Sequence, residues 1–151
     1  MTNNLNLRTG GQILVDQLRI HGADTIFCVP GESYLATLDA LFDVQNDIKL
    51  VVCRQEGGAA YMAEAYGKLT GRPGICFVTR GPGATNASLG IHTAHQDSSP
   101  VILLVGQVGR AMMDRECAPL SVVFSHVVDL DDWCLHRRLR WRPRLTNQSR
   151  H

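Results

Sequence analysis

Glu56 is the residue of this sequence with the clearest opportunity to do chemistry. It follows a short apolar segment, residues 49–53, and precedes Gly57-Gly58-Ala59-Ala60, so no bulky side chain comes after it to shield its carboxylate. Its local position supports two interpretations equally well. One is a carboxylate that exchanges a proton with a ligand. The other is an acidic residue in the first turn of a helix, where the helix dipole favours negative charge.

A second candidate is the stretch Gly81-Pro82-Gly83-Ala84-Thr85-Asn86. A Gly-x-Gly turn ahead of a helix is typical of phosphate binding, because the first backbone amides of a helix attract anions. The dinucleotide-binding fingerprint requires a third glycine where this sequence has Asn86, and Pro82 removes a backbone donor. A tight turn with Thr85 or Asn86 near a helix cap explains the pattern equally well. Dinucleotide binding is therefore a disfavoured alternative.

The histidines and cysteines do not form a metal-binding pattern. His92 and His95 are spaced i, i+3 on an expected helix, without a third ligand at suitable spacing. The five cysteines include no Cys-x-x-Cys pair, and Cys28, Cys53 and Cys76 lie in apolar stretches typical of buried strands. We therefore expect reduced thiols in the core and no metal site.

The elements that must position these residues alternate between strand-like and helix-like segments. Apolar runs predict strands at 25–29, 49–53, 74–79 and 101–105, and the remaining periodic segments predict helices at 9–19, 33–42, 55–69 and 85–95. Ser33 is expected to cap the second of these helices. Strands joined through helices require crossover connections, so the fold class is α/β, with a parallel sheet flanked by helices on both faces.

Three loops of unusual composition follow the expected strands. They are Pro30-Gly31-Glu32, Arg54-Gln55-Glu56 and the tight loop Arg80-Gly81-Pro82-Gly83. In parallel sheets, ligands bind beyond the carboxyl ends of the strands, where all three loops are expected to meet. The convergence favours a binding site at this edge.

Length and charge set the class of protein. The 151 residues suffice for one domain with a core, and a net charge of +1 argues against nucleic-acid or membrane-surface binding. No apolar run approaches the ~20 residues of a membrane span. The first nine residues contain no apolar signal core. We expect a cytoplasmic protein.

Five ordered motifs together resemble the N-terminal pyrimidine-binding domain of thiamine diphosphate-dependent enzymes, most closely that of acetolactate synthase large subunits. The motifs are Phe27-Cys28-Val29-Pro30-Gly31, Arg54-Gln55-Glu56-Gly57-Gly58-Ala59-Ala60, Ala63-Glu64-Ala65-Tyr66-Gly67, Thr79-Arg80-Gly81-Pro82-Gly83-Ala84-Thr85-Asn86 and Val105-Gly106-Gln107-Val108. Many relatives have histidine at the position of Gln55 and serine at that of Arg80. The resemblance implies the thiamine diphosphate-binding fold.

The resemblance also implies roles for individual residues. A glutamate at the position of Glu56 hydrogen-bonds N1′ of the aminopyrimidine and so favours the tautomer that removes the C2 proton of the thiazolium. The cofactor then acts as an electron sink for a 2-keto acid such as pyruvate. The resemblance places Pro30 and Gly31 in the pocket wall, and assigns Gly81, Pro82, Gly83, Thr85 and Asn86 to a loop lining the site. Gln96, just past the helix, is expected to approach it.

The family also implies partners. Its members form dimers or larger oligomers through this domain, and acetolactate synthases, which serve branched-chain amino acid biosynthesis, carry FAD structurally. They bind the diphosphate and Mg²⁺ through a Gly-Asp-Gly…Asn motif in another domain, and no such motif occurs in this sequence. We therefore expect the chain to be an incomplete enzyme alone. A non-catalytic dimerisation fragment is the alternative.

The resemblance stops near Glu116. We place a pyrimidine-binding domain at residues 1–116 and a divergent tail at 117–151. The tail holds both tryptophans, Trp133 and Trp141, and becomes rich in arginine. We interpret it as the product of a frameshift or truncation, or as a disordered extension.

Overall fold

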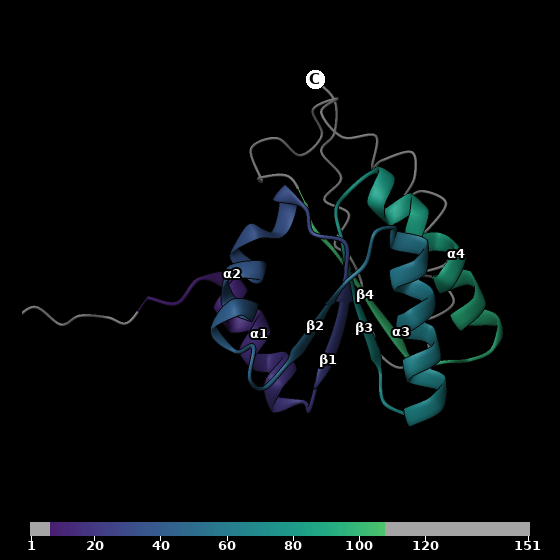
Figure 1. Ribbon diagram of the computed structural model, residues 1–151, viewed down its shortest axis with the longest axis horizontal. Coiled ribbons are helices and arrows are strands. Elements are labelled where there is room, and N and C mark those ends of the chain that lie inside the picture. The colour runs from purple at the N-terminus through teal and green to yellow at the C-terminus, as the bar shows by residue number, and fades with distance from the viewer. Residues whose placement is uncertain (1–6, 108–151) are drawn as a thin grey trace, which may run out of the picture.

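Four parallel strands form the centre of the computed structural model, which describes residues 7–107 (Figure 1). The strands are β1 (Thr25–Cys28), β2 (Lys49–Val52), β3 (Gly74–Val78) and β4 (Val101–Val105), in the spatial order β2-β1-β3-β4. The helices are α1 (Gly10–Ile20), α2 (Leu35–Asp43), α3 (Glu56–Thr70) and α4 (Pro82–Gln96), with a short 3₁₀ turn, η1, at Glu32–Tyr34. The α/β fold class is thereby confirmed.

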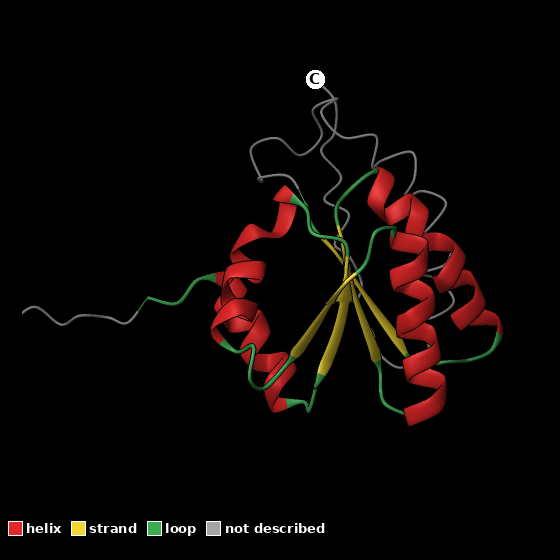
Figure 2. Cartoon of the chain, in the orientation of Figure 1, coloured by secondary structure: helices red, strands yellow, loops and turns green. Residues whose placement is uncertain are grey.

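The helices cover the two faces of the sheet in pairs (Figure 2). Helices α1 and α2 pack on one face, around a core that includes Val15, Ile26, Leu41 and Phe77. Helices α3 and α4 pack on the other, where the buried side chains are mostly alanine. Strands β1 and β3, between the two layers, are buried almost throughout, as the apolar runs predict.

Helix α1 begins where the sequence predicts. The hydroxyl of Thr9 accepts a hydrogen bond from the backbone N–H of Gln12, and the Gln12 side chain accepts one from the backbone N–H of Thr9. This reciprocal capping box satisfies two amides that the helix itself leaves without partners.

The sequence prediction and the structure differ at the N-termini of two helices, α2 and α4. Ser33 does not cap α2, because it lies within η1 and its hydroxyl pairs with that of Thr79 instead. Helix α4 begins at Pro82, so Pro82 and Gly83 form its first turn rather than a loop. Proline suits the first helical position, where its fixed φ fits and its missing N–H would have had no helical partner.

Helices α3 and α4 lie unusually close together. A Cβ added to Gly90 of α4 would stand 2.6 Å from the Cβ of Ala60 and 2.7 Å from the backbone N of Tyr61, both in α3. Only glycine permits this approach. The close packing fixes the first turns of the two helices side by side at the carboxyl edge of the sheet.

Candidate functional site

Glu56 is the first residue of α3, the helix that follows β2. The Nδ2 of Asn86, in α4, donates to its Oε2 over 3.0 Å. The carboxylate is half-buried, whereas Asn86 is exposed. The two residues are 30 positions apart in sequence, and the bond gives the carboxylate one defined orientation.

The start of α3 leaves this carboxylate accessible. Gln55 caps the helix, its side-chain oxygen accepting from the backbone N–H of Gly58 over 2.8 Å. A Cβ at Gly57 would meet that same Gln55 oxygen at 2.8 Å and the backbone oxygen of Asn86 at 3.1 Å. Glycine at this position therefore lets the cap and the neighbouring helix both approach Glu56.

Gly83 brings the start of α4 close to the other oxygen of Glu56. A Cβ added there would lie 3.4 Å from Oε1 of Glu56 and 2.8 Å from Cγ2 of Thr79. Even alanine would collide with Thr79. Oε2 of Glu56 thus faces Asn86, and Oε1 faces the backbone of Gly83.

The loop after β1 closes against the loop after β3. A Cβ at Gly31 would come within 2.8 Å of Cβ of Thr79, and the hydroxyls of Ser33 and Thr79 are 2.7 Å apart. Gly106, after β4, packs on Ser33 so tightly that a Cβ would lie 2.2 Å from Oγ. Sequence reasoning missed Ser33, Thr79 and Gly106. The available signal was a hydroxyl or glycine in the segments that follow the strands, at the ligand edge.

The start of α4 needs its glycine for another reason. Gly81 has φ of 62°, in the left-handed region that favours glycine. The hydroxyl of Thr85 donates to its carbonyl over 3.1 Å. The structure therefore brings Gly81, Gly83, Thr85 and Asn86 to the edge that holds Glu56.

Two predicted residues lie less centrally. Pro30 is exposed, in the loop beside Gly31. Gln96 is the last residue of α4, so about 20 Å of helix separates it from Pro82. The structure does not bring Gln96 to Glu56, and its approach to the site stays a prediction.

A charged pair stands at the same edge. Nη1 of Arg80, after β3, lies 3.0 Å from Oε1 of Glu32, after β1. Arg80 follows Thr79 directly and Glu32 precedes Ser33, so two consecutive residues of each loop are paired across β1 and β3. The loops form one connected rim.

The buried thiols take no part in this site. Burial raises the pKa of Cys28 to about 11 and that of Cys76 to about 12, so both stay neutral at physiological pH. Cys28, Cys53 and Cys76 are free cysteines, and Cys53 is only half-buried. The described residues contain no group of three or more His, Cys, Asp or Glu side chains arranged to hold a metal ion.

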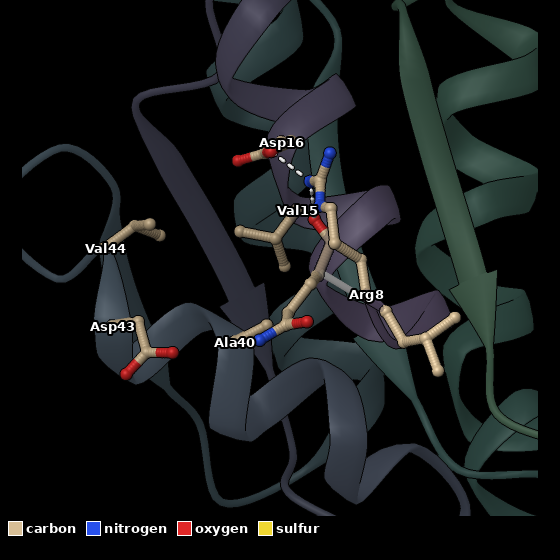
Figure 3. Close-up of a pocket in the computed structure, with 8 residues that line it drawn as sticks. Arg8, Val15, Asp16, Ala40, Asp43 and Val44 are labelled. Carbon is tan, nitrogen blue, oxygen red and sulfur yellow. Dashed lines mark hydrogen bonds and ion pairs between the residues drawn. The ribbon is translucent and has the colours of Figure 1, made fainter. Parts of the chain in front are cut away.

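A separate pocket of about 360 Å³ lies between α1 and α2 (Figure 3). Arg8 extends along α1 to pair with Asp16 there, and Val44 closes the side formed by α2. None of the predicted site residues lines it, and Arg8 and Asp16 of its lining already form an ion pair. Within residues 7–107, no helix has both the length and the hydropathy that a membrane crossing demands.

The fold and the carboxyl-edge site belong to a family of cofactor-binding domains. Residues 8–127 match the family described as "Thiamine pyrophosphate enzyme, N-terminal TPP binding domain", and the chain belongs to that family. Thiamine pyrophosphate is thiamine diphosphate under another name. The match runs past Glu116, where we place the end of the domain. That boundary and the tail at 117–151 lie outside the described residues and stay predictions.

The relatives that match this chain are acetolactate synthases. The chain is 44% identical over 111 residues to the acetolactate synthase large subunit of Pyropia yezoensis, a match covering 72% of this chain and 19% of the relative. It is 44% identical over 119 residues to that of Parasynechococcus marenigrum (strain WH8102), covering 78% and 19%. Acetolactate synthase of Bacillus subtilis (strain 168) is 43% identical over 104 residues, covering 68% and 18%. The chain spans about a fifth of the length of these curated relatives.

Proposed function

We propose that this chain binds the aminopyrimidine of thiamine diphosphate at the carboxyl edge of its sheet, with Glu56 as the residue that contacts the ring nitrogen N1′. The observation that carries the proposal is the orientation of the Glu56 carboxylate. Asn86 holds Oε2, while Oε1 lies beside Gly83, which has no side chain. The arrangement therefore suits a ring that presents one nitrogen to the second carboxylate oxygen.

Each residue of the site has a distinct part in that binding. Glu56 shares a proton with N1′, and Asn86 keeps the carboxylate from rotating away. Gly31 and Gly83 let their backbones pack closely against Thr79, and Gly81 adopts the left-handed conformation from which α4 begins. When bound, the cofactor supplies an electron sink for carbon–carbon bond cleavage and formation. Pro30, Thr85 and Gln96 are proposed lining residues.

The remaining features of the family enter as proposals. We infer that the diphosphate and Mg²⁺ bind to a different domain, because they require oxygen ligands and charge-assisted contacts that Glu56 and its neighbours do not offer. The substrate is a 2-keto acid such as pyruvate, FAD binds in the complete enzyme, and the protein works in the cytoplasm.

Association without turnover is a second candidate function. Several large apolar side chains of α3 and α4 are solvent-exposed in the chain: Tyr61, Met62, Leu69 and Leu89. Such side chains favour burial against a second copy. Sedimentation of the 151-residue chain tests this candidate. A homodimer that turns nothing over supports it, and a monomer at high concentration rules it out.

The proposed role of Glu56 is tested by hydrogen–deuterium exchange at C2 of thiamine diphosphate. The exchange is followed by ¹H NMR with Mg²⁺ present. We expect the chain to accelerate exchange and Glu56→Gln to remove roughly 100-fold of the acceleration, the ordinary scale of a proton-transferring group. Asp39→Asn, an equivalent change at an exposed carboxylate on α2, is the control and should leave the rate unchanged. Equal exchange in wild type and Glu56→Gln would rule out the assignment of Glu56.

A further inference from the structure

Arg80 and Glu32 are unequal partners in their ion pair. The Arg80 side chain is 28% exposed, whereas that of Glu32 is 68% exposed. The contact joins one guanidinium nitrogen, Nη1, to one carboxylate oxygen, Oε1, at 3.0 Å. The arginine is thus held within the loops, while the glutamate reaches it from solvent. A pair of this kind is weak, because water competes for the exposed carboxylate.

The location of Arg80 connects it to the Glu56 site. Its neighbour Thr79 is fixed by the 2.7 Å contact with Ser33. Cγ2 of Thr79 and Oε1 of Glu56 both lie against Gly83, within 3.4 Å of where its Cβ would stand. Arg80 therefore directly follows a residue that packs beside Glu56, on a backbone that the neighbouring hydroxyl pair and the left-handed Gly81 hold in place.

Charge explains why a cation at this rim matters. Glu32 and Glu56 place two carboxylates at one edge of the sheet, and they repel an approaching anion. A guanidinium has five N–H donors and binds a carboxylate best through two parallel hydrogen bonds. Glu32 engages Arg80 through a single close contact, so a free carboxylate that approaches the fork squarely can replace it.

We propose that Arg80 is a specificity-determining residue that binds the carboxylate of a 2-keto acid, and that Glu32 pairs with it when no ligand is present. This inference rests on the proposed function, because it assigns the anionic substrate to the carboxyl edge of the sheet, next to Glu56. A residue without charge at position 80 would leave the substrate's carboxylate without this partner.

The inference is tested by titrating the 151-residue chain with pyruvate. Binding is read from the guanidinium ¹⁵N signals and from saturation transfer to the pyruvate methyl group. Arg80→Ser should weaken pyruvate binding at least tenfold, and Arg80→Lys should weaken it less, because it keeps the charge without the fork. Glu32→Gln should strengthen binding about threefold or more by removing the competing carboxylate. Arg19→Ser, an arginine on α1 that pairs with Asp16 and Asp47, is the matched control and should change nothing.

Pyruvamide, which keeps the ketone but lacks the negative charge, should bind wild type and Arg80→Ser alike. Pyruvate affinity that is unchanged in both Arg80→Ser and Glu32→Gln overturns the inference, as does failure of wild type to bind pyruvate. Glu32→Gln and Arg80→Lys keep the test decisive if Arg80→Ser does not fold. Thiamine diphosphate exchange, measured separately in wild type and Glu56→Gln, reports failure of the proposed function independently of these titrations.

Discussion

Gly90→Ala should destabilise the domain although alanine is the better helix former. Gly90 lies inside α4, where an exposed glycine-to-alanine change ordinarily stabilises a helix by up to about 1 kcal/mol. Here the new Cβ would stand 2.6 Å from the Cβ of Ala60 and 2.7 Å from its carbonyl carbon. These atoms belong to another helix and are not flexible side-chain ends, so α4 must move away from α3.

The size of the effect follows from the two opposing terms. Overpacking in a tight core costs about 1–3 kcal/mol. Subtracting a gain of about 1 kcal/mol in helix propensity leaves a net destabilisation of up to about 2 kcal/mol. For a domain of this size, that corresponds to a fall in Tm of up to roughly 15 °C. Because α4 carries Asn86, the displacement should also weaken its bond to Glu56 and slow the C2 exchange reaction.

Urea unfolding followed by circular dichroism measures the change in the free energy of unfolding. Gly58→Ala is the matched control, because Gly58 lies in α3 and a Cβ there would meet nothing within 4 Å. We expect the control to gain up to about 1 kcal/mol while Gly90→Ala loses stability. If both variants gain stability to the same extent, the α3–α4 packing described above is wrong.

Three further predictions concern a helix end and the thiols. Gly71 ends α3 in the left-handed conformation, with φ of 68°, so Gly71→Ala should lower the free energy of unfolding by about 1–2 kcal/mol. Gly10→Ala is the control and should not destabilise the domain, because Gly10 has open space around it and no positive φ. Equal effects of the two variants in thermal unfolding would refute the backbone explanation. Cys28 and Cys76 stay neutral in the folded state because burial raises their pKa to about 11 and about 12, above the ordinary value of 9.0. The stability that the two neutral thiols contribute is therefore fully present below pH 9 and should be lost as the pH rises towards 11–12. Unfolding curves of wild type and Cys76→Ala between pH 8 and pH 11 measure this loss. Iodoacetamide should label half-buried Cys53 before either buried thiol by peptide mass spectrometry, and the reverse order would contradict this burial.

The strands were predictable because their signal is local. Each run of apolar side chains matches a strand to within one residue at either end, and β4 matches at both ends. Parallel strands need crossover helices, so the sheet type followed from the alternation alone. The ends of the helices were harder to predict from the sequence, because a helix cap depends on which hydrogen-bond partner a side chain finds. Ser33 has the composition of a helix cap, yet its hydroxyl pairs with Thr79, 46 residues later.

Some features of the candidate site could likewise be predicted from the sequence, and others could not. Glu56 could be singled out from its place between an apolar strand and a run of small residues, and the carboxyl edge from the rule that governs parallel sheets. Its bond to Asn86 and the packing of Gly83 against Thr79 could not be predicted, because both depend on how closely distant segments approach. The same holds for Asp24, whose pKa is lowered chiefly by hydrogen bonds from Tyr66 and Arg72, residues far away in the sequence.

Local patterns are enough to show that this chain is an α/β domain of the thiamine diphosphate family with a glutamate at the ligand edge, since periodicity, glycine turns and ordered motifs are properties of neighbouring residues. The folded structure adds that Asn86 binds one oxygen of Glu56, that Ser33 and Thr79 join two loops, and that Glu32 pairs with Arg80. These features arise between residues distant along the chain. Their geometry is set by packing at the level of a single methyl group, which no local pattern encodes.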